Sequence, residues 1–348
     1  MTHPDVFKGG PQGPHRDTIP PELSAAMDQH MLSSDGPDHA RLRRLVAAAF
    51  SRRRIDALEP RVRRIAHSLL EEIATAGSGG NHVEVAATLA YPLPSAVISE
   101  LLGVPASGNR DIQRWSTVVL NGSVHASEIF LGAATEMIDY IRQLLDAKRA
   151  EPGDDLLSAL IAVRDDDDRL SDDELTSTVL LLLAAGHETT ANLIAGAVHA
   201  LLTHPDQLVL ARAAPDRIPA IIEEVLRWNG PAQATTPFTT AAPVHVGGTT
   251  IPAGAVVLPA LLAINRDPNR FPDPDRFDST RAPVPHLAFG HGVHHCLGAP
   301  LARLEARIAI EMLIEPFPAL RLAVPDTELR WRSGLLVNAI TALPVTVR

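Results

Sequence analysis

Cys296 is the only cysteine of the 348-residue chain, so it cannot form a disulfide within it. It lies in the segment FGHGVHHCLGAPLARLEARIAI, where Gly290 and Gly292 allow tight turns and Gly298 leaves room for a flat body. A helix is predicted directly afterwards, because Pro300 suits a first turn and apolar residues follow at helical spacing. The partial positive charge at that helix start favours the thiolate, the form that binds a metal. The segment therefore predicts a metal-binding thiolate.

Two other interpretations of this segment are less consistent with its residues. A lone cysteine is ordinarily a small buried core residue, but three glycines around Cys296 disfavour that reading. A structural zinc site needs four convergent ligands, usually in two spaced pairs. The candidate ligands show no second pair: they are His286, His291, His294 and His295.

The spacing Phe-x-x-Gly-x-x-x-Cys-x-Gly, formed by Phe289, Gly292, Cys296 and Gly298, resembles the haem-binding loop of the cytochrome P450 family. The resemblance implies haem b (iron protoporphyrin IX) with the Cys296 thiolate as axial ligand. It also implies that Phe289 lies beside the sulfur, that Gly298 lies against the haem, and that His294 reaches a haem propionate. A thiolate ligand favours cleavage of the O–O bond.

A long buried helix is predicted between Ser171 and about Leu202. Ser171 and Glu174 form a capping box, and apolar periodicity follows. At 1.5 Å per residue such a helix is roughly 45 to 50 Å long. Its middle contains Gly186, which costs about 1 kcal/mol relative to alanine, and Thr189, whose hydroxyl can compete for the carbonyl of residue 185. These features predict a local groove.

The residues Ala185, Gly186, Glu188 and Thr189 resemble the segment that crosses the oxygen side of the haem in cytochromes P450. The resemblance implies that Thr189 hydrogen-bonds the dioxygen, and that Glu188 and water in the groove relay protons. The alternative is an ordinary helix with capped threonines.

His39 and Arg43 are four residues apart in a predicted helix that begins at Asp38, so they share one face. Without further information this is a solvated basic helix, but the resemblance assigns both side chains to the haem propionates. Related proteins commonly have an arginine near Phe238 for the same purpose. Residues 229–265 of this chain contain no arginine.

Glu224 and Arg227 are three residues apart on another predicted helix, a spacing that often gives only a surface ion pair. The segment FPDPDRF supplies Arg276 where the family completes a Glu-Arg-Arg triad. The resemblance therefore implies a structural triad of Glu224, Arg227 and Arg276.

The predicted fold class is mainly α with a minor β region, the cytochrome P450 fold. Residues 1–37 are expected to be irregular, with at most a short helix near 21–29, and residues 38–348 to form a single catalytic domain. Compared with the family, the chain is expected to lack the usual first helix and first sheet strands. Short strands are predicted within 244–268. Further helices are predicted at 55–75, 91–102, 112–119, 128–148 and 156–163, and a loop at 121–127.

The formal charge of −10 argues against nucleic acid as a general partner. The N-terminus lacks the apolar region of a secretion signal, and no stretch approaches the ~20 apolar residues of a membrane span, so a cytoplasmic protein is predicted. A local basic patch would suit an acidic electron donor, and ordinary solubility explains it equally well. Its members are Arg41, Arg44, Arg52, Arg53, Arg54, Arg303 and Arg307.

The expected activity is monooxygenation, in which one oxygen atom of O₂ enters a small, apolar substrate of the secondary-metabolite kind. Electrons are expected from a separate ferredoxin and its NAD(P)H-dependent reductase, because the chain carries neither a flavin motif nor an iron–sulfur motif. Two alternatives stay open: a peroxide-dependent haem oxidant, and a truncated haem-binding protein without catalysis.

Overall fold

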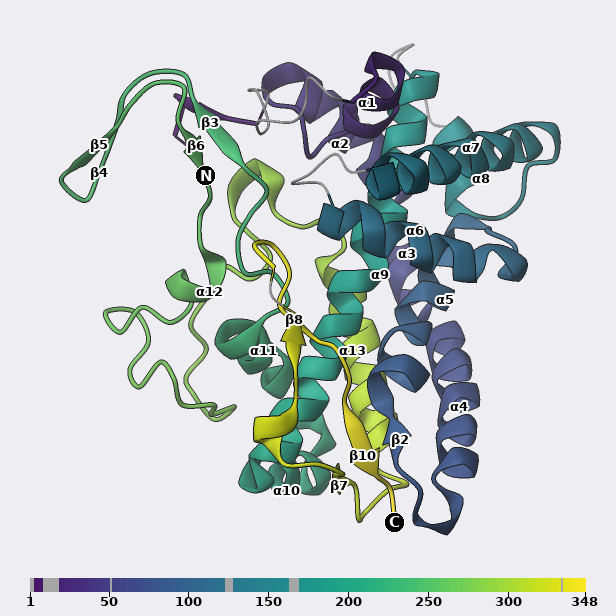
Figure 1. Cartoon of the computed structure of the whole chain (residues 1–348), viewed down its shortest axis with the longest axis vertical. Coiled ribbons are helices and arrows are strands. Elements are labelled where there is room, and N and C mark those ends of the chain that lie inside the picture. The colour runs from purple at the N-terminus through teal and green to yellow at the C-terminus, as the bar shows by residue number, and fades with distance from the viewer. Residues whose placement is uncertain (1–2, 9–18, 51, 123–127, 163–168, 333) are drawn as a thin grey trace.

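The helix α9 (Asp172–Thr203) runs through the middle of the molecule and organises the fold (Figure 1). The computed structural model describes residues 3–8, 19–50, 52–122, 128–162, 169–332 and 334–348. The predicted capping box is confirmed: Glu174 N donates to Ser171 Oγ over 3.2 Å, and Ser171 N donates to Glu174 Oε2 over 2.8 Å. These bonds satisfy N–H groups that have no partner within the helix.

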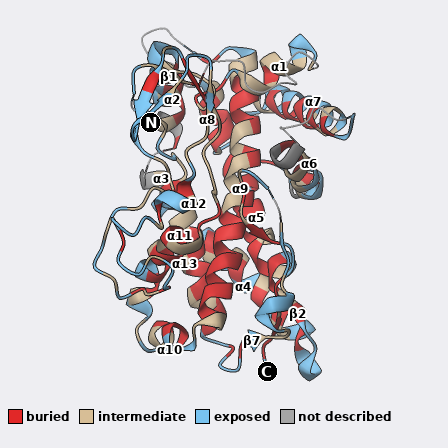
Figure 2. Cartoon of the chain, turned by 60° about the vertical axis from the view of Figure 1, so that its left-hand side comes forward, coloured by how far each residue is buried: buried red, intermediate tan, exposed pale blue. Residues whose placement is uncertain are grey.

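By length and composition alone, α9 could span a membrane, but 72% of its most apolar 18-residue window is buried inside the protein. Figure 2 shows it buried along most of its length, with other helices packed around it. An apolar surface on nearly every face is what a central core helix requires.

The helices that pack most closely on α9 are α1, α5, α6 and α13, followed by α7 and α11. One hydrophobic cluster extends from Ala26 to Val347. The helices are α1 (Pro21–Asp28), α2 (Gly36–Ala49), α3 (Arg52–Asp56), α4 (Glu59–Ala76), α5 (Pro92–Leu102), α6 (Asn109–Gly122), α7 (Glu128–Ala150), α8 (Leu156–Ala162), α10 (Pro205–Ala213), α11 (Ile218–Asn229), α12 (Leu261–Ile264) and α13 (Ala299–Ile314).

The strands are short, and all of their pairings are antiparallel. They form the sheets β1-β3-β6 and β2-β10-β7 and the pairs β4-β5 and β8-β9. The predicted mainly α class with a minor β region is therefore confirmed. The strands are β1 (Val6–Phe7), β2 (Val83–Glu84), β3 (Phe238–Thr240), β4 (Val244–Val246), β5 (Thr249–Ile251), β6 (Val256–Val257), β7 (Arg321–Leu322), β8 (Trp331–Arg332), β9 (Ala339–Ile340) and β10 (Pro344–Thr346).

The N-terminal segment is more ordered than the sequence predicted. The short helix expected near 21–29 is confirmed as α1, which packs on α9. The expectation that residues 1–37 are otherwise irregular is wrong at β1, which pairs with β3 in the register Phe7 to Thr239. A pairing across more than 230 positions of sequence leaves no local periodicity, so the pattern of residues 1–37 could not reveal it.

The other predicted helices are confirmed as α4, α5, α6, α7 and α8, with small shifts at their ends. The loop predicted at 121–127 is wrong at its start, because α6 continues to Gly122. The rest of that prediction, residues 123–127, lies outside the described residues.

Candidate active site

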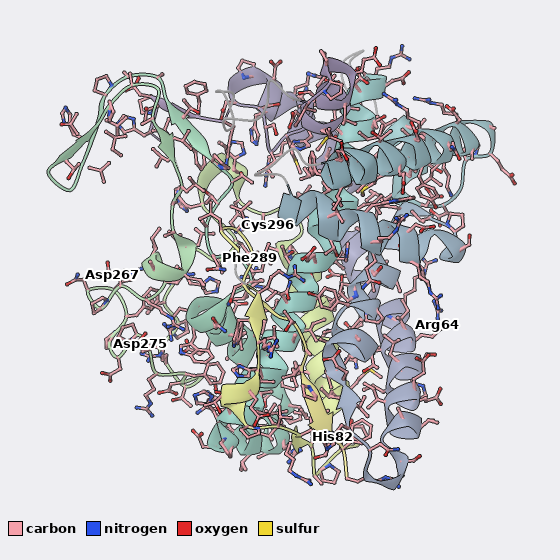
Figure 3. All side chains as sticks on the ribbon, in the orientation of Figure 1. Arg64, His82, Asp267, Asp275, Phe289 and Cys296 are labelled. Carbon is pink, nitrogen blue, oxygen red and sulfur yellow. The ribbon has the colours of Figure 1, made fainter. Side chains whose placement is uncertain are left out.

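The loop before α13 is held in a fixed shape by its glycines and one backbone bond. Gly290 and Gly292 have φ angles of 73° and 75°, in the left-handed region that favours glycine. Cys296 N donates to the carbonyl of Phe289 over 2.9 Å. Cys296 and Phe289 lie near the centre of the molecule in Figure 3. The loop therefore presents the sulfur from a rigid turn at the start of a helix.

The Cys296 thiol responds to two opposing influences. Burial raises its pKa, while the backbone N–H groups of Gly298 and Ala299, and more weakly the cations Arg43 and Arg303, act to lower it. The helix start thus acts in the predicted direction, toward the thiolate, but the effect of burial on the pKa is larger. A bound metal ion would reverse the balance, because a coordinating thiol loses its proton outright.

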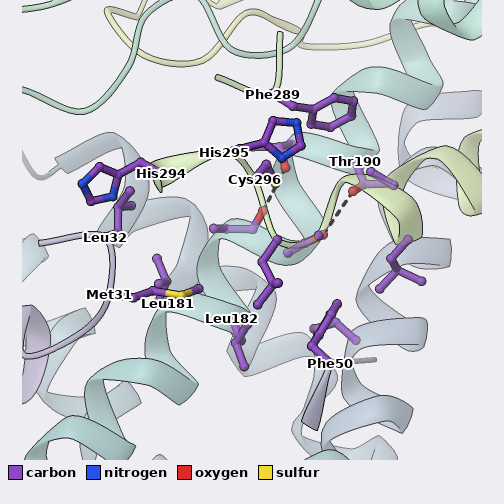
Figure 4. Close-up of a pocket in the computed structure, with 18 of the residues that line it drawn as sticks. Met31, Leu32, Phe50, Leu181, Leu182, Thr190, Phe289, His294, His295 and Cys296 are labelled. Carbon is purple, nitrogen blue, oxygen red and sulfur yellow. Dashed lines mark hydrogen bonds between the residues drawn. The ribbon is translucent and has the colours of Figure 1, made fainter. Parts of the chain in front are cut away.

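Two adjoining cavities, of about 240 and 200 Å³, lie against this loop. Both are lined by Thr189 and Thr190 of α9 and by Phe289, His294 and Cys296 of the loop. Figure 4 shows Cys296 with Phe289 and His295 on one side of the larger cavity. The remaining wall of that cavity is mostly apolar and includes Met31, Leu32, Phe50, Ile98, Leu181, Leu182 and Leu301.

The part of α9 at the cavity carries threonines whose hydroxyls bond back to the helix. Thr189 Oγ1 donates to the carbonyl of Ala185 over 2.8 Å, as predicted, and Thr190 Oγ1 donates to that of Gly186 over 3.2 Å. A Cβ atom at Gly186 would lie 3.3 Å from the Ile98 side chain. The helix is nevertheless continuous from 172 to 203, so the predicted groove is no break in the helix.

Glu188 is fully buried, but it is not among the residues that line either cavity. Its Oε1 accepts a hydrogen bond from Arg332 Nη1. The Nη2 atom of Arg332 donates to the hydroxyl of Tyr91 over 3.3 Å. Tyr91 in turn donates to Asn192 Oδ1 over 3.3 Å. Arg332 and Tyr91 carry no signal in the sequence that links them to Glu188, because they come from β8 and from the residue before α5, far from residue 188 in the chain.

His39, Arg43 and His294 are brought together, as predicted. The rings of His39 and His294 have centroids 4.4 Å apart, and Arg43 lines the larger cavity and donates to the carbonyl of His295 over 2.7 Å. Burial, followed by the charges of His294 and Arg43, lowers the pKa of His39. His39 Nε2 is a buried polar atom without a hydrogen-bond partner in the part of the chain that the structure describes. Asp35 Oδ1 lies 3.1 Å from His294 Nε2.

Glu224 and Arg227 form a buried, two-bond ion pair of 2.7 and 2.8 Å. The prediction that Arg276 is the third member of the triad is wrong. Its side chain is 68% exposed and lies 3.6 Å from Asp278 instead of contacting Glu224. Arg281 takes the position instead, with its Nε 3.1 Å from Glu224 Oε1. Only the backbone carbonyl of Arg276 takes part, accepting from Arg227 over 3.2 Å.

The predicted basic patch is weaker than its sequence suggests. Arg303 is bound by Glu223 over 2.6 and 2.8 Å and stacks 4.5 Å from the Phe289 ring centroid. Arg307 is bound by Glu59 and Glu311. Arg44 is exposed. The side chains of Arg52 and Arg53 lie outside the described part of the structure.

Comparison with known proteins identifies the family. The model described as "Cytochrome P450" matches residues 109–208 and 218–339. The chain belongs to the cytochrome P450 family. It is an oxidoreductase of the monooxygenase type, and the family implies a haem-thiolate cofactor.

Similar proteins include "Cytochrome P450 107B1" of Saccharopolyspora erythraea, 47% identical over 93% of this chain and 79% of the relative. The "6-deoxyerythronolide B hydroxylase" of the same organism is 46% identical over 94% of this chain and 80% of the relative. Among solved structures, the bacillaene polyketide synthase cytochrome P450 PksS of Bacillus subtilis 168 has a TM-score of 0.90 at 34% identity. That match covers 99% of this chain and 86% of the other. The cytochrome P450 fold predicted from the sequence is thereby confirmed.

Proposed function

We propose that this protein binds haem b through Cys296 and inserts one oxygen atom of O₂ into an apolar secondary metabolite of the polyketide kind. The observation that carries the proposal is that Cys296 and Thr189, from the loop before α13 and the middle of α9, line the same cavity. The substrate class is supported by the apolar cavity wall and by two similar proteins, one named for the hydroxylation of 6-deoxyerythronolide B and one for a bacillaene polyketide synthase.

The residues at the cavity fit a haem. Cys296 offers a sulfur at the cavity surface, and a Cβ at Gly298 would lie 3.9 Å from that sulfur, so glycine keeps this wall flat. A porphyrin is a flat apolar ring with two carboxylates, which suits an apolar wall flanked by His39, Arg43 and His294. The buried Nε2 of His39 needs a partner that a carboxylate would supply.

When bound, haem supplies the activation of O₂, and the protein's residues position the reactants and move protons. The Thr189 hydroxyl donates to Ala185 and keeps its lone pairs for a donor in the cavity, so it can hold a water or an oxygen substituent there. Glu188 lies one residue earlier, on the neighbouring face of α9, where Arg332 holds it. We assign proton delivery toward the cavity to Thr189 and Glu188 together.

The electron donor is proposed to be a separate ferredoxin with its NAD(P)H-dependent reductase, in the cytoplasm. Support comes from the lack of flavin and iron–sulfur motifs in the sequence.

Cys296→Ser provides the first test. The wild-type holoprotein is expected to give the red-shifted Soret band of a thiolate-ligated ferrous carbon monoxide complex, and the variant is expected to lose it. The same band in both proteins would remove Cys296 from the axial position.

Turnover separates the oxygenase from its alternatives. With a ferredoxin, its reductase, NAD(P)H and a panel of macrolactones, ¹⁸O from ¹⁸O₂ is expected in the product. Product formed only when hydrogen peroxide is supplied would favour the peroxide-dependent oxidant. Haem uptake without oxidation of NAD(P)H in the presence of any substrate would favour a binding protein without catalysis.

A further inference from the structure

The guanidinium group of Arg303 stacks on the ring of Phe289, in the loop that presents Cys296. Its Cζ lies 4.5 Å from the ring centroid. Phe289 accepts the backbone hydrogen bond of Cys296, and both residues line the two cavities. Figure 4 shows them on the same side of the larger cavity. A cation of α13 therefore packs on the residue that is hydrogen-bonded to the cysteine.

A carboxylate of α11 holds this guanidinium in place. Glu223 accepts from Arg303 Nε over 2.6 Å and from Nη2 over 2.8 Å, and two parallel bonds of this kind fix the plane of the group. Glu223 also accepts from His286 Nε2 over 3.1 Å. The other nitrogen of that ring accepts the backbone N–H of Ala288 over 3.2 Å. Glu223 thus anchors both the cation on Phe289 and the stretch of chain just before it.

The charge of Arg303 acts on Cys296. Burial has the largest effect on the pKa of the thiol and raises it, while Arg43 and Arg303 act to lower it. Hydrogen bonds from Glu223 raise the pKa of Arg303, and the charge of Cys296 acts in the same direction. The side chains of Arg303 and Glu223 are 39% and 42% exposed, so water screens both charges in part. The net field at the sulfur depends on the balance between this cation and this anion.

Charges beside an axial ligand change how readily the metal accepts an electron. A positive charge favours the reduced state, which carries one more electron, and a negative charge favours the oxidised state. Groups around the axial ligand are among those that set the reduction potential of a haem. Neither Arg303 nor Glu223 is among the residues that line the two cavities, so their charges can change without altering the cavity wall.

We propose that the ion pair of Arg303 and Glu223 sets the reduction potential of the haem bound at Cys296, with Arg303 raising the potential and Glu223 lowering it. The inference rests on the proposed haem site and adds two residues that act through Phe289 and the loop. They are positioning residues, because they touch neither cavity.

The test measures the ferric/ferrous midpoint potential of the substrate-free holoprotein by spectroelectrochemical titration. Arg303→Met removes the cation and is expected to lower the equilibrium constant for reduction roughly three- to ten-fold, or about 30 to 60 mV at about 59 mV per tenfold. Glu223→Gln removes the anion, keeps the side-chain shape and is expected to raise the potential by a similar amount. The double variant carries neither charge and is expected to stay near the wild-type potential.

Two variants serve as controls. Arg303→Lys keeps the charge without the flat guanidinium, and it is expected to stay near the wild-type potential. Arg307→Met removes the next arginine of α13, which is likewise ion-paired, with Glu59 and Glu311, and it is also expected to stay near that value. If Arg303→Met does not fold, Arg303→Gln removes the same charge, keeps a donor for Glu223 and is expected to shift the potential in the same direction.

The opposite signs separate an effect of charge from a loosening of the loop, because both single substitutions break the same ion pair. Shifts of the same sign, or none, would overturn the inference. The Soret band of the ferrous carbon monoxide complex reports whether each variant keeps its thiolate ligand, and loss of that band would show a purely structural role for the pair. A wild type that takes up no haem refutes the proposed function as well, whereas unchanged potentials in haem-loaded variants refute the role of the ion pair alone.

Discussion

Replacing Arg281 is expected to destabilise the protein far more than replacing Arg276. Both are arginines of the polar segment after α12, but only Arg281 bonds Glu224. Glu224 is 6% exposed and Arg281 has a side chain that is 19% exposed, so their bond is poorly screened by water. Arg281 also donates to the carbonyl of Arg276 over 2.9 Å, which ties the surrounding segment to α11. Replacing Arg281 therefore removes both an ion pair and a loop anchor.

The expected losses in the free energy of unfolding differ several fold between the Arg281 and Arg276 variants. A hydrogen bond to a charged group contributes about 1.5 to 3 kcal/mol, and breaking a buried ion pair costs about 3 to 5. Because Arg227 remains on Glu224 in the variant, Arg281→Met is expected to lower the free energy of unfolding by about 2 to 4 kcal/mol. Arg276→Met removes a mostly exposed side chain and is expected to change it by at most about 0.5 kcal/mol.

Urea unfolding of the two holoproteins, followed by circular dichroism, measures this difference as a shift of the midpoint at unchanged slope. The Soret absorbance reports separately when haem is released. Equal shifts in the two variants, or a larger shift in Arg276→Met, would show that the bonds of Arg281 do not stabilise this region and that Arg276 completes the triad after all.

Two further predictions concern proton delivery and pH. Thr189→Ala is expected to keep haem binding but to divert reducing equivalents into hydrogen peroxide, and an unchanged ratio of product to NAD(P)H consumed would contradict the role of Thr189. Burial acts to raise the pKa of Glu223, but the hydrogen bonds and charges of Arg303 and His286 together outweigh burial and lower that pKa to about 2. The stability it contributes is therefore present above its ordinary value of 4.5 and is lost as the pH falls toward 2. Since its side chain is 42% exposed, that contribution is limited to about 1 kcal/mol. The difference in urea midpoint between wild type and Glu223→Gln is expected to shrink by more than half from pH 7 to pH 3, and a constant difference would refute it.

Local signals in the sequence sufficed where structure is local. The capping box at Ser171 and Glu174 located the start of α9, and the glycines around Cys296 predicted the turn that presents its sulfur. His39 and Arg43 shared a helix face as their spacing required. In each case a short stretch of chain determines its own conformation.

The roles that the sequence did not predict correctly depend on contacts between segments that are distant in the chain. Arg276 and Arg281 lie in a proline-rich stretch without periodicity, where the loop path decides which side chain reaches α11. Glu188 and Thr189 are consecutive on a helix, so their side chains point about 100° apart. Thr189 therefore lines the cavity, while Glu188 bonds Arg332. Lys8 lines the smaller cavity and reaches it through a strand pairing that only the folded chain creates.

The residues around the two cavities run from Lys8 to Ala302, and each wall combines segments that lie far apart in the chain. During synthesis the ribosome makes β1 before its partner β3, which follows more than 220 residues later. The loop before α13, which carries Cys296, is made later still. Until that point the apolar wall is incompletely covered, and exposed apolar surface makes a partly made chain prone to aggregation. If Cys296 binds haem as proposed, the cofactor can be enclosed only after both walls of the site have been made.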